Sequence, residues 1–256
     1  AKFPEVTNEI GEEFHELTNG NPRLQNYIVS TTKELDKALD FVRPDGKKLE
    51  DIFDGFIEAV KKQYIGAYNT DLVFFAASRM IRPVPIEIIC NICGISFEML
   101  NSICVECHYG LYNKNKQLSF RDEDFENYLQ SKFSDSMHFM SEIADYLYAK
   151  RNEDAYCARY VHLFLDAANQ FEKIIQISLN EEVDGTSVGV AQSNKVMLAR
   201  INTALARPEI RRVDVYKLIY RQADFCAGED SLSKLLFEAP EEISIFCDEM
   251  SIRSVI

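Results

Sequence analysis

Apolar residues recur every three or four positions along most of this chain, which is the spacing of an amphipathic helix rather than the alternation of a strand. In the first quarter, the pattern predicts helices over residues 3–17, 22–39 and 49–64, with polar turns between them. Asn21 is a good N-cap for the second helix. Pro22 suits its first position, because the N–H that proline lacks would have no partner there.

The pattern changes in the middle of the chain. Residues 71–81 and 86–93 predict two apolar helices, and a third over residues 96–108 begins at a serine that can cap it. Residues 111–120 predict two short strands around a turn rich in Asn and Lys. Another amphipathic helix begins at Arg121. Helix, helix–turn–helix, hairpin and helix is the order of elements in a winged-helix domain.

Helical spacing returns in the last part of the chain. It predicts helices over residues 136–148, 154–179, 193–205, 212–226, 230–237 and 241–250. Successive helices with short turns are typical of α-α superhelical repeats of the tetratricopeptide-like kind, although no fixed repeat period is present.

The sequence therefore predicts a mostly α fold with a single small β-hairpin. We expect a small helical domain over residues 1–66, a winged-helix domain over residues 67–133 and a helical repeat-like domain over residues 134–256. The polar segment 180–187 is the best linker candidate within the last part.

Charge narrows the choice of partners. The 256 residues carry 28 Lys and Arg against 41 Asp and Glu, a net charge of −13, and such a chain repels phosphate backbones. The predicted recognition helix contains Glu98 and Glu106 but no Lys or Arg, and the wing adds Lys114 and Lys116. We therefore expect the winged helix to contact protein and not DNA.

Hydropathy and the use of cysteine predict the cellular compartment of the protein. No apolar run approaches the roughly 18 residues of a membrane span, and no signal peptide opens the sequence. The seven cysteines are an odd number and lie in apolar helical positions, as reduced thiols do. We expect a cytoplasmic protein with no membrane partner.

Two CxxC pairs raise the alternative of a structural zinc site. Cys90 and Cys93 are separated from Cys104 and Cys107 by ten residues, and four thiolates at short spacing can bind Zn²⁺ tetrahedrally. The segment between the pairs has the pattern of a capped amphipathic helix and not that of a zinc ribbon. This favours the cysteines as small core residues and no metal in the chain.

No catalytic constellation is present in the sequence. The four histidines lie far apart, and the patterns GxSxG, HExxH, GxGxxG and GxxxxGK[ST] are missing. The acidic run 122–124 can bind a divalent cation, but consecutive acids at a helix start more often act as caps and dipole partners. We expect this chain not to be an enzyme by itself.

Three short segments together resemble the regulatory region of STAND-type signalling NTPases, the NACHT and NB-ARC families. Residues 18–22, Thr-Asn-Gly-Asn-Pro, resemble the GxP turn of the small helical domain. Residues 82–94 resemble the start of the family's winged helix. Residues 120–129 resemble its HxxFxxYL segment, with Asp122 in place of the histidine.

The resemblance implies nucleotide contacts from Gly20, Pro22 and Asp122. In the family, the proline packs near the adenine base, and the histidine contacts the β-phosphate of ADP in the closed state. A carboxylate at Asp122 repels phosphate unless a cation or a basic partner intervenes.

The resemblance spans about residues 1–180. It implies a non-catalytic regulatory and sensor portion of a signalling switch. An NTPase domain upstream of Ala1 would bind ATP or ADP with Mg²⁺ and would be its partner in cis, with a protein trigger or self-association as the signal. Bacterial members often act in defence against phage. The alternatives are a stand-alone winged-helix transcription regulator with a helical dimerisation tail, and a zinc-stabilised adaptor.

Overall fold

The structure is a computed structural model that describes residues 7–31, 35–42, 48–66, 68–107, 110–183 and 188–238. It is mostly helical with one small antiparallel sheet, which confirms the predicted fold class. The chain divides after Ser134 into two compact units, residues 1–134 and residues 135–256.

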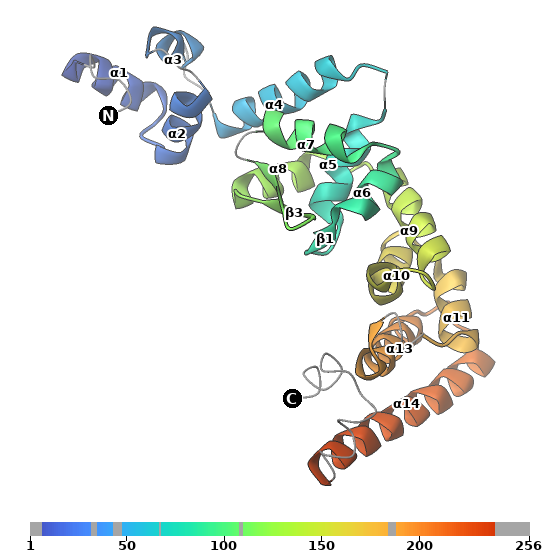
Figure 1. The fold of residues 1–256 in the computed structure, drawn as a ribbon. Coiled ribbons are helices and arrows are strands. Elements are labelled where there is room, and N and C mark those ends of the chain that lie inside the picture. Colours follow the sequence, from blue (N-terminus) through green and yellow to red (C-terminus); the bar gives the residue numbers. More distant parts are fainter. Residues whose placement is uncertain are drawn as a thin grey trace. The chain divides into compact units, whose positions relative to one another are not determined.

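The first unit begins with four helices and continues with the winged helix (Figure 1). Its elements are α1 (Asn8–Leu17), α2 (Pro22–Thr31), α3 (Leu35–Val42), α4 (Leu49–Gln63), α5 (Thr70–Arg79), β1 (Val84–Pro85), α6 (Ile86–Cys93), α7 (Phe97–Glu106), β2 (Leu111–Lys114), β3 (Gln117–Phe120) and α8 (Glu123–Lys132). The predicted helix over residues 22–39 is thus two helices, α2 and α3.

The winged helix has the predicted element order. Gly94 ends α6 in the left-handed region at φ 65°, and the Ser96 side chain caps α7 by accepting from the Met99 N–H. The sheet contains one strand more than predicted. The order of the strands in the sheet is β1-β3-β2, and Val84 of β1 pairs with Leu118 of β3. A two-residue strand is too short to leave a period in the sequence.

Gly110 precedes β2 at a point where no side chain fits. A Cβ at this position would lie 2.2 Å from Cδ1 of the fully buried Phe125. We expect Gly110→Ala to lower the free energy of unfolding by about 1–3 kcal/mol, through overpacking, in denaturant titrations. Gly55→Ala on α4 is the matched control, because a Cβ there meets no atom within 4 Å. Equal losses in the two variants would contradict the steric argument.

The described part of the second unit consists of helices, each of which packs against the next one along the chain (Figure 1). Within it, α10 packs against α9, α11 and α13, and α14 packs against α11 and α13. These helices are α9 (His138–Lys150), α10 (Ala155–Ala167), α11 (Phe171–Asn180), α13 (Val190–Leu205) and α14 (Arg212–Glu238).

Two predicted boundaries in this unit were wrong. The single helix predicted over residues 154–179 is broken between α10 and α11, where Asn169 takes φ 57°. The Gln170 N–H donates to the Leu165 carbonyl over 2.8 Å, which is a Schellman-type ending with Asn in the place of Gly. The opposite error occurs later, because the two helices predicted over residues 212–226 and 230–237 are the single helix α14. The helix predicted over residues 241–250 lies outside the described residues.

No single helix in the described part of the chain is long and apolar enough to cross a membrane. The helices α6 and α7 meet that criterion only when they are taken together, and they are bent by 99° at the break between them. Ile89, Leu100 and Ile103 from this pair are completely buried. Their apolar character is thus used in the core of the first unit.

Candidate functional site at the junction of α2 and α8

The turn before α2 sets the direction of that helix. Gly20 lies in the left-handed region at φ 67°, and a Cβ there would approach the His15 ring to 3.0 Å. Asn21 then caps α2, since its Oδ1 accepts hydrogen bonds from the backbone N–H groups of Arg23 and Leu24 at 3.0 and 3.2 Å. The turn therefore starts α2 so that its first two turns face α8.

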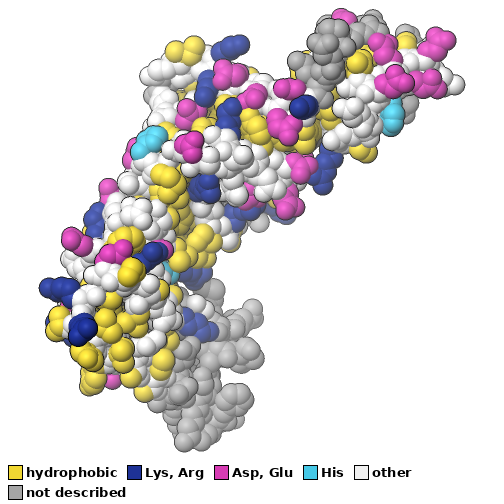
Figure 2. All heavy atoms as spheres, turned by 180° about the vertical axis from the view of Figure 1, so that it is seen from behind, with side chains coloured by type: hydrophobic (Ala, Val, Ile, Leu, Met, Phe, Trp, Pro, Cys, Tyr) yellow, Lys and Arg dark blue, Asp and Glu magenta, His cyan; other side chains and the backbone are white. Residues whose placement is uncertain are grey.

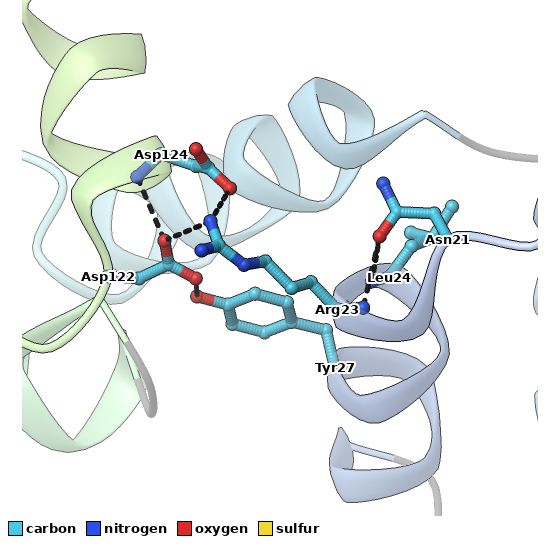
Figure 3. Close-up of polar contacts among 6 residues, drawn as sticks. All are labelled: Asn21, Arg23, Leu24, Tyr27, Asp122 and Asp124. Atoms are coloured by element: carbon cyan, nitrogen blue, oxygen red, sulfur yellow. Dashed lines mark hydrogen bonds and ion pairs between the residues drawn. The ribbon is translucent and has the colours of Figure 1, made fainter.

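Asp122 joins α2 to α8. It caps α8, with its Oδ1 accepting from the Asp124 N–H at 2.8 Å, while its Oδ2 accepts from the Tyr27 hydroxyl at 2.6 Å (Figure 3). Arg23 Nη1 lies 3.7 Å from Asp122 Oδ1 and also forms an ion pair with Asp124. We call Arg23, Tyr27, Asp122 and Asp124 the α2–α8 latch.

The components of the α2–α8 latch differ in strength. Burial first, and then the hydrogen bond to Asp122, raise the pKa of Tyr27, so its hydroxyl keeps the proton that it donates. Asp122 is only 15% exposed. The Arg23 side chain is 60% exposed, and an ion pair at such a position contributes little in water. The Tyr27–Asp122 hydrogen bond is therefore the stronger part.

An aromatic cluster lies beneath the α2–α8 latch. The Phe53 ring of α4 lies 5.6 Å from the Tyr27 ring, 4.9 Å from the Phe125 ring and 5.4 Å from the Tyr128 ring, measured between centroids. Phe56 contacts the same group from the next turn of α4. Aromatic pairs at these separations are favourable beyond the area they bury. The helical part and the winged helix thus share one core.

A second polar contact joins α4 to α8. Asp54 accepts hydrogen bonds from the Tyr128 hydroxyl and from the Lys132 ammonium. These two bonds lower the pKa of Asp54, the Lys132 bond having the larger effect. Burial, with the bond to Asp54, raises the pKa of Tyr128 to about 12. The helix α8 is consequently tied to α2 at its start and to α4 along its length.

Two cavities flank the junction. One, of about 620 Å³, lies between the turn before α2, the start of α4 and one face of α8, and its polar lining includes Asn19, Asn21, Lys48 and Asn127. The other, of about 400 Å³, is lined by Arg23, Tyr27 and Asp122 of the α2–α8 latch together with Asn26, Arg121 and Glu123. Cavities of this size accommodate small organic ligands.

Of the three predicted nucleotide-contacting residues, Gly20 and Pro22 lie at the start of α2 and Asp122 lies at the start of α8. Asp122 contacts α2, the helix that Pro22 begins, through Tyr27 and Arg23. Gly20 and Pro22 line neither cavity, and Pro22 is exposed. Gly20 lies in the turn before α2, in the left-handed region. The arrangement can hold two parts of the unit together, and its Lys and Asn side chains can donate to a polar ligand.

Several residues of the site carry no signal in the sequence. Tyr27 has the spacing of a core residue, and nothing indicates its hydrogen bond to Asp122, 95 positions away. Arg23 and Lys48 read as ordinary surface cations until the fold places them beside α8 and the larger cavity. Only the tertiary contact between α2, α4 and α8 makes these residues a site.

The four cysteines of the zinc alternative lie in the core of the winged helix. Cys90, Cys93, Cys104 and Cys107 are buried, and burial raises the pKa of Cys104 to about 11. A raised pKa favours the neutral thiol, whereas the thiolate is the form that binds metal. In the residues that the structure describes, no group of three or more His, Cys, Asp or Glu side chains is placed to share a metal ion.

Comparison with known proteins adds no identification. None of the protein-family models matches the chain, and the search of curated proteins gives no match.

Proposed function

We propose that this chain is the non-catalytic regulatory portion of a STAND-type signalling switch, in which an NTPase domain upstream of Ala1 binds ATP or ADP with Mg²⁺. The observation that carries the proposal is the α2–α8 latch. The segments that resemble the GxP turn and the HxxFxxYL segment are far apart in the sequence, and the hydrogen bond from Tyr27 to Asp122 joins the helices that they begin.

The latch suggests how such a switch is held. Asp122 replaces the family's phosphate-contacting histidine, and both of its oxygens have partners within the protein. In this proposal a hydrogen bond between α2 and α8 takes over part of the closing role that the histidine has toward ADP. A contact of this kind can hold one state of a two-state element, and its loss favours the other.

The larger cavity supports a place for the neighbouring nucleotide. Lys48, Asn21 and Asn127 line it, and these side chains supply hydrogen-bond donors next to the latch. Such donors fit the polar edge of a nucleotide that another domain holds. The nucleotide supplies the free energy of the switch, and the residues of this chain orient α8 against α2.

The surface of α7 supports a protein partner for the winged helix. Phe97 and Val105 are 44% and 64% exposed, and the acidic residues Glu98 and Glu106 lie on the same helix. A helix that reads DNA needs Arg, Lys, Asn or Gln at base edges and phosphates. The Asn101 side chain accepts a hydrogen bond of 2.9 Å from the side chain of Asn113 in the wing. The residues of this helix therefore do not support the alternative of a transcription regulator. Sequence-selective binding of DNA in a gel shift would support that alternative.

The test uses the protein with its upstream domain, whose coding sequence should contain a phosphate loop. Tyr27→Phe removes one hydrogen bond to a charged group and leaves the ring, and we expect it to speed release of bound ADP by on the order of tenfold. Basal signalling should rise with it. The readout is release of a fluorescent ADP analogue.

Tyr64→Phe is the matched control, because the Tyr64 hydroxyl accepts from the side chain of its neighbour Gln63 and lies outside the latch. ADP release at the wild-type rate in Tyr27→Phe, or an upstream coding sequence without a phosphate loop, would refute the proposal.

A further inference from the structure

The N-terminal half of α14 exposes an apolar stripe. Val213, Tyr216, Ile219 and Tyr220 are 52%, 74%, 50% and 71% exposed. Their spacing of three, three and one places them on one face of the helix, while Leu218 on the opposite face is fully buried. Figure 2 shows this surface at the lower left, where hydrophobic side chains gather among Lys and Arg.

A shaped groove runs beside the stripe. It has a volume of about 470 Å³ and lies between the end of α11, at Leu179 and Asn180, and the face of α14 that carries Tyr216 and Tyr220. Arg221 fixes one wall, because its guanidinium donates to the Leu179 carbonyl and, over 2.7 Å, to the Glu181 carbonyl. These bonds cap the end of α11. The groove is therefore formed without a partner.

The segment that carries the apolar stripe is basic within an acidic chain. Residues 211–222 contain four basic residues and one acid, a charge of +3, against −13 for the whole chain. The acid, Asp214, is buried and paired with Arg211 over 2.6 Å. Arg212 and Lys217 are exposed beside the aromatic rings. Tyrosine and arginine are enriched in protein interfaces, where a polar rim surrounds an apolar centre.

We propose that this face of α14 binds an acidic amphipathic helix of a partner protein. Val213 to Tyr220 spans about 10 Å, roughly two helical turns, which matches anchors at i, i+3 or i+4 and i+7 of a helix in a groove. Acidic residues on such a helix meet Arg212 and Lys217. Nucleic acid and anionic membranes are repelled by the rest of the chain. A second copy of this face would bring like charges together. The proposal stands on this surface alone, whatever the role of the latch.

The test selects peptides on the full chain from a random library of about 16 residues, enough for four helical turns. We expect the selected sequences to be acidic, with Leu, Ile or Phe at helical spacing. A selected peptide should bind Tyr216→Ala/Tyr220→Ala at least about tenfold more weakly than wild type in fluorescence anisotropy. Lys217→Glu should weaken the binding of this peptide several-fold. The same variant should bind a version of the peptide with Lys in place of its acidic residues more tightly than it binds the original peptide.

Leu163→Ala and Lys114→Glu are the matched controls, since Leu163 is exposed at 42% on α10 and Lys114 is exposed on the wing. Both control variants should bind the selected peptide with the affinity of the wild type. Selected peptides that are basic or lack helical spacing would overturn the proposal. Peptide affinities that are the same for the wild type and for both α14 variants would also overturn it. So would an oligonucleotide that binds this face more tightly than the peptide, or self-association of the chain that the double variant abolishes.

Discussion

Phe53→Ala is expected to lower the free energy of unfolding of the first unit by about 3–5 kcal/mol, the usual cost of removing a buried phenyl ring. Phe53 is 1% exposed and contacts rings from α2 and from α8. Its loss opens a cavity at the point where the helical part and the winged helix share a core. That cost is a large share of the stability of an ordinary domain.

The measurement is hydrogen exchange resolved by peptide, because the chain has no Trp to report unfolding and contains two units. Phe97→Ala is the control, since Phe97 is 44% exposed on α7. The faster exchange should spread over α2, α4 and α8 together. Exchange that rises in α4 alone would mean that the aromatic cluster does not join these helices.

The second large effect concerns pH and the second unit. His162 on α10 is 5% exposed, and its Nδ1 has no hydrogen-bond partner among the described residues. Burial first, and the neighbouring Arg200 guanidinium second, lower the pKa of His162 to about 4 from its ordinary value of 6.5. The folded protein therefore keeps this imidazole neutral at a pH where the unfolded chain protonates it.

The direction of the effect follows from that difference. Above pH 6.5 the imidazole is neutral in both states and costs nothing. Below that pH the unfolded chain binds the proton first, so stability falls as the pH approaches 4. Since each unit of pKa difference is worth 1.36 kcal/mol, the loss amounts to about 3 kcal/mol near pH 4.

The pKa of His162 can be read directly from the NMR titration of its ring, and stability from denaturant titrations at several pH values. His162→Gln should remove about 3 kcal/mol of the difference between neutral and acidic pH. His138→Gln is the control, because His138 is exposed. A His162 pKa near 6.5 would contradict the prediction.

Arg200 offers an independent check of the same site. It is 1% exposed and donates to the Ala158 carbonyl over 2.7 Å. Two of its guanidinium nitrogens have no hydrogen-bond partner in the part of the chain that the structure describes. Ala158 and His162 lie one turn apart on α10, and the charge of Arg200 lowers the pKa of His162. Arg200→Met should raise the pKa of His162, although burial keeps it below its ordinary value.

Features of the fold that depend on interactions between residues close in the sequence could be predicted from the sequence. Local rules placed the helix starts at Asn21 and Ser96, whose side chains accept hydrogen bonds from the backbone as expected. They also gave the order of elements in the winged helix and the mostly α class. Each of these signals acts within a few residues of chain.

Local rules failed where the deciding contact was distant or lacked its usual residue. The strand β1 exists because Val84 pairs with Leu118, and the break after α10 depends on an Asn at 169 where Gly is the common signal. Asp122 could be identified as a cap, but not as the acceptor for Tyr27.

The sequence by itself thus determined the helical content, the caps and the acidic charge, because each depends on residue type and short spacing. The tertiary structure alone decided which residues meet. It placed α2 and α4 against α8 to form the latch and its cavity, and it buried Arg200 beside His162. Long-range packing leaves no period in a sequence, since its free energy comes from surfaces that only the fold brings into contact.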